Sequence, residues 1–166
     1  MKSLILTQEV HYKRGEKIMN FEIKSFDELT VDEMYEIAKS RFEVFVCEQK
    51  IIEEQDFDNR DKSSYHIMLK EKGRVIAYSR IVPKNIGYEY TSIGRVLVIK
   101  SYRRKGIAQE MMKYCLNFIK NDLDESVVVV SAQEYVKKMY EGVGFEIISD
   151  TYNEVNIPHV KMIMRL

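Results

Sequence analysis

The sequence predicts a single α/β (α+β) domain built on a mixed β-sheet, and three observations lead to this prediction. The chain has 166 residues, of which 45% are hydrophobic and 31% charged, which is an ordinary composition for one globular domain. Strand-like and helix-like segments follow one another in the order β-α-β-β-β-α-β-α-β-β. The four valines at 127–130 are typical of a central strand buried on both faces.

The first elements are a short strand and a long helix. Phe21–Ser25 has the pattern of a strand, and Thr30 is a good N-cap residue whose capping box Glu33 completes. Apolar residues then recur at helical spacing, which predicts a helix to about Glu48. These residues are Val31, Met34, Tyr35, Ala38, Phe42 and Phe45. An acidic loop follows at residues 53–61.

Three further strands occupy the middle of the chain. Residues 65–70 and 74–82 are predicted strands, and Lys72-Gly73 is the turn between them. After a loop at residues 83–87, another strand is expected over 91–99.

The last third of the chain alternates between helices and strands. A helix is expected after Gly106, and the valine run is the next strand. A short helix follows at 134–142, and residues 145–152 and 160–165 are the final strands. Helices that cross between strands in this way predict a parallel section of the sheet.

The N-terminal residues 1–18 fit this pattern poorly. We expect them to be an extension that precedes a single domain over residues 19–166, and the hypothesis is that Met19 is the natural start. The apolar run at residues 4–6 is too short for a signal peptide, and no stretch has the length of a membrane span. The protein is therefore expected to be cytoplasmic.

Composition argues against several classes of partner. Lys and Arg together number 26, as do Asp and Glu, so no overall field attracts nucleic acid or an anionic membrane. Cys47 and Cys115 lie in apolar helical patterns and lack metal-site spacing, which is typical of buried free thiols in a reducing cytosol. The three histidines are scattered, so no zinc site is expected.

One basic stretch breaks a local rule. Arg103, Arg104 and Lys105 come directly before Gly106, at the start of a predicted helix, although cations suit helix C-termini. Unpaired N–H groups and a partial positive charge at a helix start attract anions, and glycine lets a phosphate approach the backbone. Cations are tolerated at this place if a pyrophosphate is expected there.

This stretch fits the pattern Gln/Arg-x-x-Gly-x-Gly/Ala, and with five further stretches it resembles the GNAT acyltransferase superfamily. The likeness covers about residues 20–166 and is greatest to the ElaA-type subfamily. Ala108 and Asn156 stand where glycine is more frequent. The matching stretches are residues 41–49 (RFEVFVCEQ), 93–98 (IGRVLV), 103–108 (RRKGIA), 131–133 (SAQ), 139–145 (MYEGVGF) and 157–159 (IPH).

The resemblance implies a GNAT fold, in which six to seven strands are flanked by about four helices and two strands splay at the acyl-CoA site. It implies acetyl-CoA as acyl donor. One N–H, of Leu97 or Val98, would polarise the thioester. The cofactor-binding residues that it implies are Val96, Leu97, Val98, Arg103, Arg104, Lys105, Gly106, Ile107, Ala108, Ser131 and Gln133.

Transfer of an acyl group to an amine needs an acid for the departing thiolate and a base for the amine. By resemblance the acid is Tyr140. The candidate bases are Glu154 and His159, and Glu89 and Glu43 are less favoured candidates. Arg41, Glu48 and Arg95 are expected to shape the acceptor pocket, although Arg41 and Glu48 are equally compatible with a structural set of ion pairs.

The predicted function is N-acylation, with acetyl transferred to the primary amine of a small molecule or peptide. Two alternatives stay open: a non-catalytic acyl-CoA-binding regulatory module, and an enzyme similar to acyl-homoserine-lactone synthases. The acidic run Asp56–Asp61 lacks the glycine and glutamate of an EF-hand, so it is a solvated turn or part of the acceptor site. A homodimer is compatible with this fold.

Overall fold

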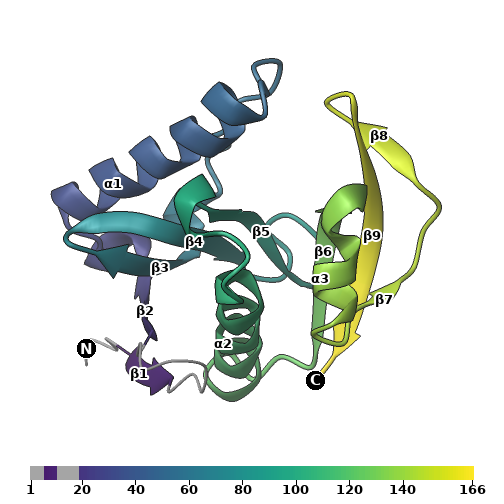
Figure 1. Ribbon diagram of the computed structural model, residues 1–166. Coiled ribbons are helices and arrows are strands. Elements are labelled where there is room, and N and C mark those ends of the chain that lie inside the picture. The colour runs from purple at the N-terminus through teal and green to yellow at the C-terminus, as the bar shows by residue number, and fades with distance from the viewer. Residues whose placement is uncertain (1–5, 11–18) are drawn as a thin grey trace.

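The computed structural model describes residues 6–10 and 19–166, and one mixed sheet lies at its centre (Figure 1). The order of the strands is β1-β2-β3-β4-β5-β6-β9-β7, with β8 paired to β9. The strands are β1 (Leu6–Val10), β2 (Met19–Ser25), β3 (Tyr65–Glu71), β4 (Arg74–Val82), β5 (Thr91–Val98), β6 (Val127–Gln133), β7 (Glu146–Ile147), β8 (Tyr152–Glu154) and β9 (Ile157–Arg165). The α+β fold class with a mixed sheet is confirmed.

Helical segments cover both faces of this sheet. The α-helices are α1 (Val31–Arg41), α2 (Ile107–Asn121) and α3 (Lys137–Glu141). The π-helical segment η2 (Phe42–Glu48) continues α1, and η5 (Glu134–Val136) leads into α3. Single turns complete the set at η1 (Phe26–Glu28), η3 (Asp61–Ser63) and η4 (Lys100–Tyr102). The predicted long helix to Glu48 is therefore present, with a widened last part.

The capping box that the sequence predicts starts α1. Thr30 accepts a hydrogen bond from the Glu33 backbone N–H at 3.1 Å, and the Glu33 carboxylate accepts one from the Thr30 N–H at 2.9 Å. The same carboxylate also pairs with Lys24 and Lys70, from β2 and β3. The cap therefore also fixes the start of α1 to the sheet.

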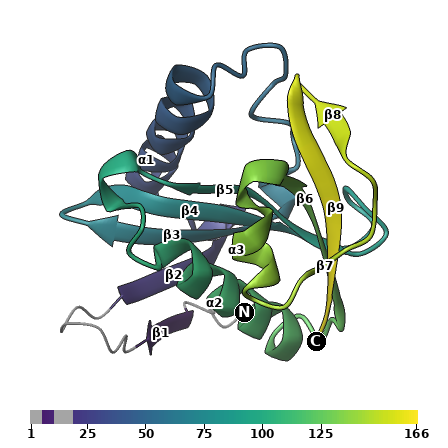
Figure 2. The same ribbon diagram turned by 45° about the vertical axis from the view of Figure 1, so that its right-hand side comes forward.

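Two apolar clusters hold the layers together. The larger one lies between the sheet and helices α2 and α3, and Met111, Cys115 and Ile119 of α2 are fully buried in it. The smaller one lies under α1 and η2 on the opposite face and includes Ile37 and Val44. Cys115 is buried as predicted, but Cys47 of η2 is exposed, so its predicted burial was wrong. Figure 2 shows α1 on one side of the sheet and α2 with α3 on the other.

The strand at the valine run is less buried than predicted. Val128 and Val130 are buried against the α2 side, but Val127 and Val129 are only partly buried. The reason is that the helix on that side of the sheet, α1, packs mainly over β4. The same face of β6 also carries Ser131 and Gln133.

The last predicted strands differ from the observed ones in extent. The expected strand over 145–152 is two short strands, β7 and β8, with an irregular connection between them. β9 starts at Ile157, three residues earlier than predicted. Val155 and Asn156 link β8 to β9 with φ values of 45° and 61°. Positive φ values at both central residues are what a two-residue type I′ hairpin turn requires.

Strands β5 and β6 pair only at their beginnings. They are parallel neighbours at Thr91–Val128 and Ser92–Val129, and no pairing follows these two positions. β5 nevertheless runs on to Val98 and β6 to Gln133. The two strands therefore splay, as expected, and they open the centre of the sheet.

Most of the expected N-terminal extension lies outside the described residues, and the start at Met19 stays a prediction. Within it, β1 pairs antiparallel with β2, with Leu6 opposite Ile23. Among the helices in the described residues, none combines the length and the apolar character needed to cross a bilayer.

Candidate active site

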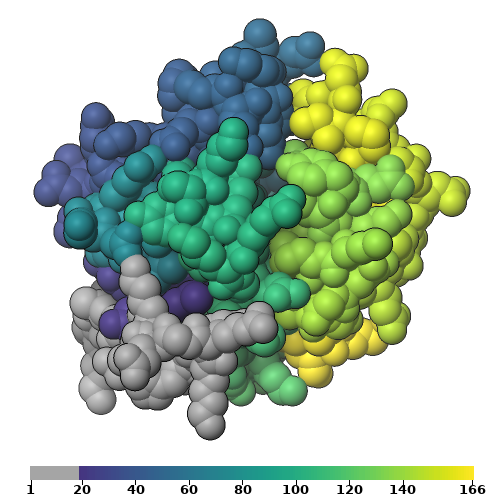
Figure 3. Space-filling model, in the orientation of Figure 1, coloured from purple at the N-terminus to yellow at the C-terminus, as the bar shows by residue number. Residues whose placement is uncertain are grey.

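A cavity of roughly 770 Å³ lies where β5 and β6 separate. Its walls come from β5, the loop before α2, β6, η5 and α3, the β8–β9 hairpin, and the loop that follows η2. In the space-filling view the C-terminal part of the chain, from β6 onward, meets the part from α1 to α2 along the boundary where β5 and β6 separate (Figure 3). The cavity therefore spans the two halves of the sheet.

At one end of the cavity the chain turns sharply into α2. Arg104 and Gly106 both have left-handed backbones, with φ values of 60° and 77°. The first hydrogen bond of the helix runs from the Glu110 N–H to the Gly106 carbonyl, so the preceding N–H groups have no partner within the helix. Arg104, Gly106, Ile107 and Ala108 line the cavity, which gives this end free N–H donors and positive charge.

The two other cations of this loop have different surroundings. Arg103 donates from both terminal nitrogens to the Glu48 carboxylate, at 2.5 and 2.8 Å, and from Nε to the Val98 carbonyl at 2.7 Å. Its hydrogen bond and charge lower the pKa of Glu48, which lies outside the cavity lining. Lys105 lies 5.1 Å from the Tyr102 ring and donates to the Ser101 carbonyl. Arg103 lines the cavity and also connects the loop to η2 and β5, whereas Lys105 lies outside the cavity lining.

The three residues Val96, Leu97 and Val98 form the β5 wall. The Ile99 N–H donates to the Ile76 carbonyl of β4, and hydrogen-bonded pairs alternate along antiparallel strands. By this alternation Leu97, opposite Tyr78, directs its N–H toward β4, whereas Val98 directs its N–H toward the open side. Of the two expected thioester-binding N–H groups, Val98 is the one that the alternation favours.

Tyr140 of α3 lies at the bottom of the cavity. Its side chain is buried, and the ring makes an edge contact with Phe145. Burial raises the pKa of its phenol well above the ordinary value, so the group keeps its proton at neutral pH. Within residues 19–166 its hydroxyl has no hydrogen-bond partner, although Tyr140 lines the cavity. It is a protonated donor without a protein acceptor.

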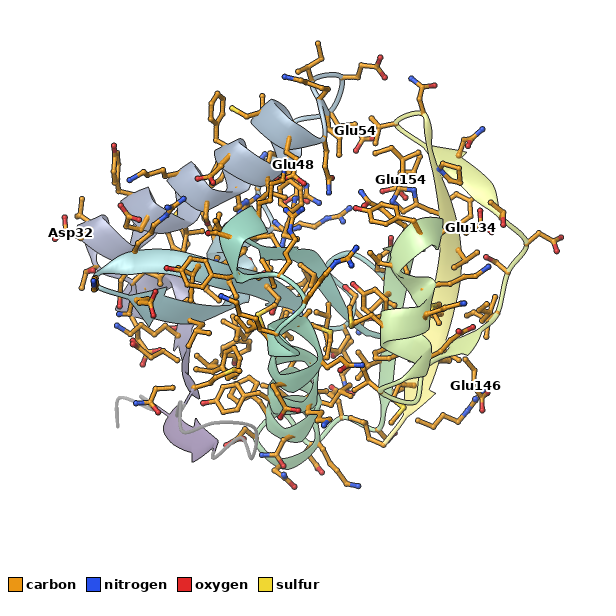
Figure 4. All side chains as sticks on the ribbon, viewed as in Figure 1. Asp32, Glu48, Glu54, Glu134, Glu146 and Glu154 are labelled. Atoms are coloured by element: carbon orange, nitrogen blue, oxygen red, sulfur yellow. The ribbon has the colours of Figure 1, made fainter. Side chains whose placement is uncertain are left out.

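The opposite end of the cavity carries both candidate bases. Glu154 and His159 line it together with Ser131, and the Ser131 hydroxyl lies 3.1 Å from Glu154 Oε2. His159 Nδ1 is 2.7 Å from the Ile157 carbonyl, which can only accept, so Nδ1 is the donor of this hydrogen bond. Figure 4 shows Glu154 at the β8–β9 hairpin, across from Glu54 of the loop that follows η2.

A network of arginines and aspartates supports this end. Arg41 has no exposed surface and pairs with Asp56 and Asp61, at 2.8 and 2.6 Å. Arg95, which has a left-handed backbone with φ 55°, donates to Asp56 and lines the cavity. Asp58 receives two hydrogen bonds from the buried Arg80. Arg41 therefore lies behind the cavity wall and Arg95 in it.

A family model described as an acetyltransferase (GNAT) domain matches residues 23–166. The chain belongs to the GNAT acetyltransferase family. A UPF0039 protein of Schizosaccharomyces pombe is 37% identical over 89% of this chain and 98% of its own. The resemblance to the GNAT family that its motifs indicate is thus confirmed over most of the sequence.

Two crystal structures of bacterial proteins match the GNAT fold of this chain. One is an acyl-CoA N-acyltransferase from Pseudomonas aeruginosa, with a TM-score of 0.80 and 30% identity, covering 86% of this chain and 97% of that one. The other is Escherichia coli ElaA, with a TM-score of 0.81 and 28% identity, covering 87% of this chain and 98% of that one. The ElaA-type resemblance is therefore also confirmed.

The GNAT motifs do not indicate every residue at this site. Tyr88, from the loop before β5, lines the cavity, and its pKa is raised by burial and then by the charge of Glu154. Tyr152 contacts Ser131 from behind the wall. Neither residue belongs to a matching stretch, and a lone tyrosine carries no pattern. Asp56 was visible in the acidic run, but its arginine partners are far away in the sequence.

Proposed function

We propose that this protein is an acyl-CoA-dependent N-acyltransferase. The acyl group that we propose is acetyl, and it is transferred to a primary amine of a small molecule or peptide. The single observation that supports this most is the unpaired groove between β5 and β6, which runs from the free N–H groups before α2 to the carboxylate of Glu154. One end suits a pyrophosphate and the other an ammonium group.

The residues of the groove fit an acyl-CoA in type and position. Gly106, Ile107 and Ala108 would bind the pyrophosphate through backbone N–H groups, with Arg104 adding charge. The free edge of β5 at Val96 and Val98 would pair with the amide-bearing pantetheine arm as an added strand does. Gln133, which donates to Gln49 at 3.1 Å, lies on the β6 side of the same groove.

When bound, acetyl-CoA would supply a thioester carbonyl that an amine can attack. The Val98 N–H, directed to the open side of β5, would stabilise negative charge on the carbonyl oxygen. Tyr140 lines the cavity and would donate its phenol proton to the departing thiolate. Its raised pKa makes the phenol a weak acid, so the transfer depends on alignment with the thiolate as the carbon–sulfur bond breaks. No nucleophilic side chain is needed, because the amine itself forms the new bond while the carbon–sulfur bond breaks.

Glu154 is the better placed of the two candidate bases. Its carboxylate lines the cavity and forms no ion pair within the described residues, whereas His159 is buried and stacks against Tyr152, with ring centroids 6.1 Å apart. We assign to Glu154 the removal of a proton from the acceptor ammonium, directly or through a water molecule.

The test is an assay of thiol release from acetyl-CoA with a panel of primary amines. Release that depends on the amine, with a matching acetylated product by mass spectrometry, supports the proposal. Binding of acetyl-CoA without release from any amine would instead favour a non-catalytic acyl-CoA sensor. Failure of acetyl-CoA to bind at millimolar concentration would contradict both.

A further inference from the structure

Behind Glu154 a second tyrosine forms part of a hydrogen-bonded chain. The Tyr152 hydroxyl lies 2.5 Å from Ser131 Oγ, and Ser131 Oγ lies 3.1 Å from Glu154 Oε2. Ser131 belongs to β6, whereas Tyr152 and Glu154 are the first and last residues of β8. Tyr152 does not line the cavity, but the other two residues do. The hydrogen-bonded chain therefore runs from Tyr152, behind the cavity lining, to Glu154, which faces the cavity.

The chemistry of the three groups fixes the direction of this chain. A carboxylate oxygen can only accept, so the single proton of the Ser131 hydroxyl is donated to Glu154. Tyr152 must then donate its own proton to Ser131 Oγ. Each hydroxyl polarises the next one toward the negative charge, which strengthens the contact with the carboxylate.

The strand that carries Glu154 has little other support. β8 has three residues, and its only partner strand in the described part of the chain is β9. The turn that follows Glu154 contains Val155 in a left-handed conformation that β-branched residues rarely adopt. β9 is paired with β6, but β8 has no direct pairing with β6, and the hydrogen bonds from Tyr152 to Ser131 and from Ser131 to Glu154 connect β8 to that strand.

We propose that Tyr152 and Ser131 are positioning residues that hold the Glu154 carboxylate toward the acceptor amine. The inference rests on the proposed function, in which Glu154 accepts the proton of the ammonium group. Tyr152 acts on Glu154 only through Ser131. Its ring also packs on His159, so Tyr152 positions both Glu154 and His159. Neither hydroxyl gains or loses a proton in the reaction.

Steady-state kinetics of Tyr152→Phe give the first test, because this change removes only the hydroxyl. We expect kcat to fall about tenfold, as the loss of one hydrogen bond in a chain to a charged group implies, with the KM for acetyl-CoA unchanged. Tyr90→Phe is the matched control, since Tyr90 is exposed and lies outside the cavity lining. Ser131→Ala should resemble Tyr152→Phe, and Ser131→Thr, which keeps a hydroxyl, should restore most of the rate.

A double-mutant cycle separates positioning from a general structural role. In a Glu154→Gln background, Tyr152→Phe should cause no further loss of kcat, because the group that it positions is already changed. An equal tenfold loss in both backgrounds would overturn the proposal. So would a rise in the KM for acetyl-CoA with kcat unchanged.

A spectroscopic readout keeps the test independent of turnover. With tyrosine labelled by ¹³C at Cζ, we expect the Tyr152 resonance to move in both Ser131→Ala and Glu154→Gln, and to stay in place in Glu54→Gln. If the wild-type protein releases no CoA with any amine, the proposed function fails, but this spectrum still reports on the hydrogen bonds that join Tyr152, Ser131 and Glu154. A Tyr152 resonance that moves in neither variant overturns the positioning proposal, whatever the activity.

Discussion

Arg95 donates from Nε to Oδ1 of Asp56 at 2.8 Å, and this ion pair joins the loop that follows η2 to the bulge in β5. The other carboxylate oxygen of Asp56 accepts from the fully buried Arg41. The bulge is where β5 shifts its register against β4 and where Arg95 has its left-handed backbone. One carboxylate therefore connects the interior under α1 to the strand edge that we assign to the acyl donor.

Substitution of Asp56 should cost stability. Asp56→Ala leaves Arg41 with the Asp61 carboxylate and leaves Arg95 with the more distant Asp58, at 3.6 Å. Removal of one partner of a buried pair costs about 3 kcal/mol. Urea unfolding measures this loss. Glu146→Ala, which removes an exposed pair with Arg165, is the control and should change stability by less than about 1 kcal/mol. Equal effects of the two changes would contradict the structural role of Asp56.

The stability of the protein should depend on pH through Asp58. Burial alone would raise the pKa of this group, but the hydrogen bonds and charge of Arg80 outweigh burial and lower it from 3.8 to about 2. A carboxylate with a lowered pKa stabilises the fold above its unfolded pKa, and this stabilisation is lost as the pH falls through the folded value. The window is therefore from about pH 4 down to about pH 2.

Comparison with Asp58→Asn isolates this contribution. The variant should be less stable than the wild type by about 2 kcal/mol at pH 6, and the difference should shrink toward pH 2. Urea unfolding at steps of one pH unit measures both curves. Parallel curves over this range would show that Asp58 has no lowered pKa in the folded protein.

Tyr140→Phe should reduce catalysis and leave binding intact. A proton donor for the leaving group typically contributes about a hundredfold to the rate, so kcat should fall by about that factor. The dissociation constant of acetyl-CoA and the melting temperature should change little, because the hydroxyl has no hydrogen-bond partner in residues 19–166. Tyr35→Phe on the exposed side of α1 is the control. Full activity of Tyr140→Phe would remove this residue from the mechanism.

Val155→Asn should stabilise the fold. Val155 has φ 45°, and a left-handed conformation costs a residue with a Cβ about 1 kcal/mol, which asparagine tolerates better. Thermal and urea unfolding should show a gain of about that size. Val155 also lines the cavity, so a loss of activity beside a gain in stability would indicate that the side chain is retained for the acceptor. A loss of stability would contradict the strain argument.

Local patterns predicted most of the fold. The capping box at Thr30, the turn at Lys72–Gly73 and the strands on either side of it are where the sequence places them. Each depends on residues close together in the chain, whose geometry follows from spacing. The burial of Val127 and Val129 was predicted wrongly, because which face a helix covers depends on packing between distant elements.

The site was predictable in part for the same reason. The basic triplet and Gly106 form a continuous motif, and α2 begins directly after Gly106, as the sequence predicts. The partners of Arg103 and Arg41 come from η2 and from the acidic loop, so their roles needed coordinates. Tyr152 gave no signal, because its function in our account depends on a hydroxyl of another strand.

The central claim is that the turn before α2 binds the pyrophosphate of an acyl-CoA. Gly106→Ala and Gly73→Ala form a matched pair, since the two glycines have φ values of 77° and 80° and an alanine at either position costs about 1 kcal/mol of stability. Only Gly106 lines the cavity, whereas Gly73 lies in the turn between β3 and β4.

Titration calorimetry of acetyl-CoA against S-acetylpantetheine, which lacks the pyrophosphate, is the most direct measurement. The wild type and Gly73→Ala should bind acetyl-CoA at least about tenfold more tightly than S-acetylpantetheine, and Gly106→Ala should lose most of this difference. Equal affinity of the wild type for the two compounds, or an unchanged preference in Gly106→Ala, would contradict the claim.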